Sequence, residues 1–142
     1  MISVNKTVIT HSFEETQQLG FNFAKTLKGG EVIALHGDLG SGKTTFVQGF
    51  AKGLGIEKNI ISPTFIIMRT YTMKHGNFYH VDLYRIGNKK EVEDIGLLEL
   101  MTDPHNIVAI EWPEKFENLL PDKRKDLFFE YKGNDERSII IT

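Results

Sequence analysis

The sequence Gly37-Asp38-Leu39-Gly40-Ser41-Gly42-Lys43-Thr44-Thr45 decides how this chain is interpreted. It matches the pattern of a phosphate-binding loop, in which a glycine is followed by four residues, a second glycine, a lysine and a serine or threonine. Glycine lacks a Cβ atom, so such a loop can turn tightly and direct several backbone N–H groups at one phosphate. Lys43 is then placed to reach the β- and γ-phosphates, and the Thr44 hydroxyl to hold Mg²⁺. The alternative is an ordinary glycine-rich surface turn.

The residues on either side favour the phosphate site over the surface turn. Residues 32–35 (VIAL) form the short apolar run of a buried strand. Residues 46–54 place apolar side chains at helical spacing. A strand, a glycine-rich loop and a helix in that order are the context that the motif requires. We therefore predict a nucleotide site, with these binding residues: Gly40, Ser41, Gly42, Lys43, Thr44 and Thr45.

Composition limits the functions that remain. A chain of 142 residues is expected to form one domain, spanning residues 1–142. Its net charge of −2 argues against non-specific binding of nucleic acid or anionic membranes as the main activity. The absence of cysteine excludes disulfides, thiolate metal sites and a cysteine nucleophile. No apolar run approaches the ~20 residues of a membrane span, and no signal peptide is visible, so we expect a cytoplasmic protein.

The remaining patterns predict an α/β fold of the P-loop NTPase type. It would have three layers, with a mostly parallel central sheet and antiparallel strands at its edges. A capping box at Ser12 opens a helix that ends at Gly29-Gly30. Further strands are expected at 3–10, 65–73, 78–85 and 107–112, helices at 92–101 and 114–120, and a terminal hairpin from 127–132 and 137–142.

The strand at 107–112 is the second informative stretch. Its apolar run ends at Glu111, and the carboxyl ends of parallel strands are where doubly wound sheets bind ligands. We predict that Glu111 and Thr44 hold Mg²⁺ and that Glu111, with Lys43, is catalytic; the alternative for Glu111 is a surface residue. Trp112 either forms a wall of the nucleotide pocket or packs under the following helix.

Two other positions are candidates for the same site. The alternation of the strand at 78–85 puts His80 and Asp82 on one face. We predict that Asp82 lies near the γ-phosphate and positions water or supports Mg²⁺ as a catalytic residue, with His80 in the pocket. The alternative is a solvent-facing edge strand. Thr64, which follows Pro63, either belongs to a switch-like loop or lies in an ordinary turn.

Four motifs in this order resemble the bacterial TsaE (YjeE) family of P-loop ATPases in tRNA threonylcarbamoyladenosine synthesis. They are residues 37–45, 62–65 (SPTF), 79–85 (YHVDLYR) and 110–112 (IEW), the last followed by Glu114 and by Leu120-Pro121. The resemblance covers nearly the whole chain, and Ser41 stands where many members have alanine.

The resemblance implies a slow ATPase that uses ATP and Mg²⁺. It also implies that the chain works with the TsaB and TsaD subunits, which modify the tRNA adenosine beside the anticodon, so that the chain meets tRNA only indirectly. Carried over by position, Gly40 to Thr45 bind ATP, Thr44 and Glu111 hold Mg²⁺, Asp82 supports hydrolysis, and Thr64 belongs to a switch-like loop.

Two other functions are compatible with a phosphate-binding loop. A small-molecule kinase usually needs an arginine-bearing lid, and no lid-sized insertion lies between Tyr84 and Ile107. A nucleotide-gated binding module needs only different partner affinities in its ATP and ADP states. Slow turnover is expected because no internal arginine finger is evident, with Arg69 and Arg85 as the two arginines that would change this expectation.

Overall fold

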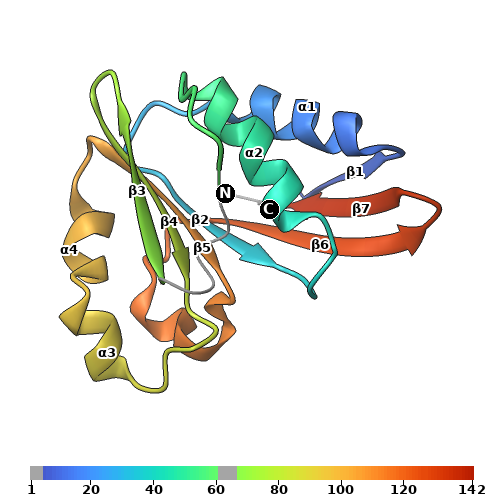
Figure 1. Cartoon of the computed structure of the whole chain (residues 1–142). Helices are drawn as coiled ribbons and strands as arrows, with labels where there is room; N and C mark the ends of the chain where they lie inside the picture. Colours follow the sequence, from blue (N-terminus) through green and yellow to red (C-terminus); the bar gives the residue numbers. More distant parts are fainter. Residues whose placement is uncertain (1–4, 61–66) are drawn as a thin grey trace.

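The centre of the fold is a seven-stranded sheet with the strand order β1-β7-β6-β2-β5-β4-β3 (Figure 1). The computed structural model describes residues 5–60 and 67–142. The strands are β1 (Lys6–Thr10), β2 (Val32–His36), β3 (Met68–Met73), β4 (Gly76–Asp82), β5 (Asn106–Glu111), β6 (Lys125–Gly133) and β7 (Glu136–Ile141). The helices are α1 (Phe13–Ala24), α2 (Lys43–Gly53), α3 (Lys89–Asp94) and α4 (Leu97–Thr102), with a 3₁₀ segment, η1, at Pro113–Leu119.

The pairing of the strands confirms the predicted fold class. The neighbouring strands β6, β2, β5 and β4 run parallel. The outer strands β7 and β1 on one side and β3 on the other are added antiparallel. β2 and β5 are buried along their whole length, as expected for central strands covered on both faces.

Two apolar cores separate the three layers. Helices α1 and α2 cover one face of the sheet (Figure 1), where Phe50 of α2 packs against Phe46 of the same helix and against Phe78 of β4. The other face packs against α3, α4 and η1, and its core includes Val92 and Leu97. Side chains of β2 enter both cores, so the strand that leads into the glycine-rich loop is enclosed on both faces.

The two long helices approach each other closely because glycines line their contact. A Cβ atom at Gly20 of α1 would collide with the backbone carbonyl of Phe46, and one at Gly49 of α2 with that of Gln17. This contact holds α2, and therefore the loop at its start, at a fixed distance from α1.

Several element boundaries differ from the sequence-based predictions. The first helix ends at Ala24 rather than near Gly29, and β4 ends at Asp82 rather than at residue 85. The helix predicted at 92–101 is two short helices, because the backbone of Gly96 is left-handed with φ 77°. The helix predicted at 114–120 is the 3₁₀ segment η1. Within the described residues, the strand predicted at 65–73 begins at Met68.

Among the helices of the described residues, none combines the length and the apolar character that crossing a membrane requires.

Replacement of Gly49 by alanine should destabilise the protein, although alanine has the higher helix propensity by about 1 kcal/mol. The added methyl group would meet the carbonyl of Gln17, so we expect the free energy of unfolding in a denaturant titration to fall by about 1–3 kcal/mol. Lys52→Ala, at an exposed position of the same helix, is the matched control. A Gly49→Ala protein as stable as this control would contradict the close helix contact.

Candidate functional site

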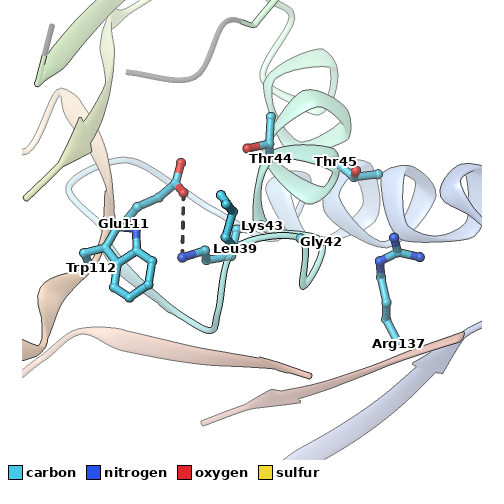
Figure 2. A pocket seen from close by; sticks show the side chains of 9 residues that line it. Leu39, Gly42, Lys43, Thr44, Thr45, Glu111, Trp112 and Arg137 are labelled. Carbon is cyan, nitrogen blue, oxygen red and sulfur yellow. Dashed lines mark ion pairs between the residues drawn. The ribbon is translucent and has the colours of Figure 1, made fainter. Parts of the chain in front are cut away.

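The glycine-rich loop, residues 37–42, connects the end of β2 to the start of α2. β2 pairs in parallel with β5, and Leu35 lies opposite Glu111 in this register. The two strands therefore end at the same edge of the sheet. A pocket of about 170 Å³ lies at this edge and is shown in Figure 2. It is lined by Leu39, Gly40, Gly42, Lys43, Thr44, Thr45, Glu111, Trp112 and Arg137.

The backbone of the loop takes conformations that favour glycine. Gly40 has φ 82°, and Gly42, which immediately precedes α2, has φ 112°, a left-handed region that other residues adopt only with strain. The N–H of Ser41 donates to the carbonyl of Asp38 at 3.1 Å. The buried hydroxyl oxygen of Ser41 has no hydrogen-bond partner. The loop is thus a tight turn in which the Ser41 hydroxyl remains without a hydrogen-bond partner.

Lys43 is a buried cation at the floor of the pocket. Its side chain is 5% exposed, and its Nζ donates to the carbonyl of Gly37 at 2.6 Å. Burial lowers the pKa of Lys43, and nearby carboxylates, Glu111 foremost, oppose that effect. The Glu111 carboxylate is 3.9 Å from Nζ (Figure 2). Because burial disfavours the charged ammonium, an anion entering the pocket would stabilise it.

Glu111 is buried, and His80 forms a hydrogen bond with its carboxylate. The Nε2–H of His80 donates to Oε2 of Glu111 at 2.6 Å, and His80 is fully buried. The Nδ1 atom of His80 has no partner. β4 pairs on both sides, with β3 and β5, so the alternative of a solvent-facing edge strand is wrong. His80 orients the carboxylate from inside the core and does not line the pocket surface.

Asp82 lies on β4 directly opposite Glu111 of β5 in the strand register. It is 2% exposed, and its Oδ1 accepts a hydrogen bond from the N–H of Tyr84 at 2.8 Å. Its charge acts on the pKa of Lys43. Asp82 therefore lies near the lysine and the glutamate, and it is not among the described residues that line the pocket.

Trp112 follows Glu111 and closes one side of the pocket. Its backbone is left-handed, with φ 56°, a conformation that is strained for a bulky residue and is often found at functional sites. Its ring lies 4.1 Å from Nζ of Lys43 and 5.2 Å from the ring of Tyr84. Of the two interpretations for Trp112, the structure favours the pocket wall.

Arg137 is a pocket residue that sequence reasoning missed. It reaches the loop from β7 on the side away from Glu111 (Figure 2). No local pattern around residue 137 indicates this position. It depends on the pairing of β7 with β6 and on the pairing of β6 with β2, a strand far away in the sequence. Arg69 and Arg85 are not among the described residues that line the pocket. Thr64 lies outside the described residues.

The family model described as "Threonylcarbamoyl adenosine biosynthesis protein TsaE" matches residues 10–139. The chain belongs to the TsaE family. It therefore belongs to a family of tRNA threonylcarbamoyladenosine biosynthesis, in agreement with the resemblance of its four motifs.

Individual TsaE relatives match along most of their length. The TsaE protein of Rickettsia bellii is 38% identical over 143 aligned residues, which cover 100% of this chain and 98% of the relative. The TsaE protein of Bacillus subtilis is 41% identical over 129 residues, or 91% of this chain and 80% of the relative. The crystal structure of YdiB from Bacillus subtilis superposes with a TM-score of 0.83 at 33% identity, covering 99% of this chain and 86% of that chain.

Replacement of His80 by alanine should destabilise this TsaE-family chain strongly. It leaves a cavity and removes the hydrogen-bond donor of the buried Glu111 carboxylate. We expect the free energy of unfolding to fall by about 3–5 kcal/mol in a denaturant titration. His75→Ala, at an exposed position, should change it by less than about 0.5 kcal/mol. Equal stability of the two variants would contradict the buried pair.

Proposed function

We propose that this chain binds Mg²⁺-ATP in the pocket and hydrolyses it slowly. We further propose that this cycle supports the TsaB and TsaD subunits, which attach the threonylcarbamoyl group to the tRNA adenosine beside the anticodon. The observation that carries the proposal is the meeting of Lys43 and Thr44, at the start of α2, with Glu111, at the end of β5, in one pocket. In this arrangement the protein contacts tRNA only indirectly, through its partners.

The donor groups of the pocket fit a magnesium ion that arrives with a nucleotide. Among residues 5–60 and 67–142, no cluster of three or more His, Asp or Glu side chains forms a metal site by itself. Mg²⁺ in nucleotide sites does not need such a cluster, because waters and phosphate oxygens complete its six ligands. The Thr44 hydroxyl and the Glu111 carboxylate are the protein groups that would hold it. When bound, Mg²⁺ would neutralise charge on the terminal phosphates.

The residues of the loop have distinct roles in this proposal. The backbone N–H groups from Gly40 to Thr45 surround the phosphates, and the positive N-terminal end of α2 favours their charge. Lys43 exchanges its hydrogen bond to the carbonyl of Gly37 for one to a phosphate oxygen. The fold already holds this ammonium away from water. Its attraction to the phosphates is therefore screened less than that of an exposed lysine.

Hydrolysis also requires a positioned water molecule. Asp82 lies beside Lys43 and Glu111, and its carboxylate is oriented by the N–H of Tyr84, so we assign it to the water or to the outer shell of the metal. Arg137, the arginine that lines the described pocket, lies at the end away from Glu111 (Figure 2). The terminal phosphate therefore has no arginine from this pocket lining, which supports slow turnover that partner subunits accelerate.

Purified protein should hydrolyse ATP weakly, and addition of TsaB and TsaD should raise the steady-state rate. Lys43→Ala should abolish activity in both conditions, because the variant lacks the cation that contacts the phosphates. Lys52→Ala, an exposed lysine of the same helix, is the matched control and should hydrolyse ATP like wild type. Binding of ATP without hydrolysis in either condition would instead support a nucleotide-gated binding module.

Asp82→Ala should separate binding from turnover. We expect ATP affinity close to that of wild type and a hydrolysis rate lower by about 10²–10⁴-fold, the range of a positioned proton acceptor. Calorimetric titration and phosphate release measure the two quantities, and reconstituted tRNA modification measures the consequence. If modification continues without hydrolysis, nucleotide binding alone is sufficient, and turnover is not part of the function.

A further inference from the structure

The two ends of the pocket differ in chemistry. Glu111 and Trp112 lie at one end with Lys43, whereas Thr45 and Arg137 lie at the other (Figure 2). The first end carries a carboxylate and suits a metal ion and the terminal phosphate. No carboxylate is among the described lining residues of the second end, which instead presents a planar cation.

Arg137 is held in place by three contacts. A Cβ atom at Gly42 would lie 2.7 Å from its Cδ and 2.9 Å from its Nε, so the side chain packs directly on the loop. Its guanidinium carbon lies 5.0 Å from the ring centre of Tyr131, and its Nη1 donates to the carbonyl of Asp135 at 3.1 Å. The guanidinium is therefore fixed at the pocket wall.

The charge of Arg137 has no acidic partner among the described residues. Within the part of the chain that the structure describes, no carboxylate forms an ion pair with Arg137, and its buried Nε has no hydrogen-bond partner. An arginine that is held rigidly, yet lacks an acidic partner, is suited to contact a ligand. The ring of Tyr131 lies near the guanidinium, and Arg137 also lines the pocket, where a second planar group can contact it.

The direction of the bound nucleotide follows from the proposed function, on which this inference rests. If Lys43 and Glu111 hold the terminal phosphate and the metal, the phosphate chain runs away from them past Thr45. The nucleoside then lies at the end of the pocket that Arg137 forms. Guanidinium planes stack on aromatic rings with favourable energy, and a purine base presents such a ring.

We propose that Arg137 binds the nucleoside half of the nucleotide by packing its guanidinium plane against the purine base. The terminal hairpin would thus recognise the base, while the loop and β5 bind the phosphates and the metal. This role belongs to substrate binding and does not require Arg137 to act on the reacting phosphate.

Calorimetric titration with two ligands, Mg²⁺-ATP and Mg²⁺-tripolyphosphate, tests this proposal because the second ligand lacks the nucleoside. Arg137→Met keeps the aliphatic stem that packs on Gly42 and removes the planar cation. It should weaken ATP binding by about tenfold, within the range of cation–π contacts, and leave tripolyphosphate binding unchanged. Arg137→Lys keeps the charge without the plane and should also lose ATP affinity.

Lys132→Met is the matched control, because it removes one positive charge from the same hairpin at an exposed position. It should bind both ligands like wild type. Equal weakening of both ligands in Arg137→Met, or full ATP affinity in Arg137→Lys, would overturn base stacking in favour of a charge that acts on the phosphates. Unchanged ATP affinity in Arg137→Met would show that Arg137 makes no energetically important contact with the nucleotide, and would overturn the proposal. Two other results would overturn the proposed function itself. One is wild-type protein that binds neither ligand, and the other is a Lys43→Ala variant that binds both ligands as tightly as wild type does.

Discussion

The parallel pairing of β2 with β5 is the constraint on which the site depends. It brings the glycine-rich loop, which follows β2, beside Glu111 at the end of β5. Both strands are buried on both faces, so a one-residue slip in their register would exchange the side chains that pack into the two cores. The hydrophobic layers therefore fix the distance between a buried lysine and a buried carboxylate, and the chemistry of the pocket follows from the packing of the sheet.

Electrostatic compensation makes this buried arrangement stable. Lys43 and Glu111 are each 5% exposed, and an isolated charge at such a depth would be costly. Glu111 receives a hydrogen bond from His80 and lies near the lysine, while Lys43 donates to a backbone carbonyl. The lysine keeps a lowered pKa because burial outweighs its acidic neighbours. An anionic ligand would add further negative charge beside the lysine and oppose the effect of burial on its pKa.

Local patterns were sufficient to predict the strand, loop and helix around residues 37–45 and the carboxylate of Glu111, because each is encoded by a few adjacent residues. The fold class and the family followed from the same stretches. His80 was harder to interpret, because its polarity suggests a surface whereas its pairing with Glu111 allows full burial. Arg137 reaches the pocket because β7 pairs with β6 and β6 pairs with β2. The local sequence around residue 137 does not reveal which distant strands will pair, so it could not predict this position.

The most direct test of this account is a crystal structure with a non-hydrolysable ATP analogue and Mn²⁺ in place of Mg²⁺, with the metal located by anomalous scattering. The account predicts a triphosphate enclosed by residues 40–45, with the anomalous peak between the Thr44 hydroxyl and the Glu111 carboxylate. A nucleotide bound elsewhere, or a metal peak remote from both residues, would contradict it.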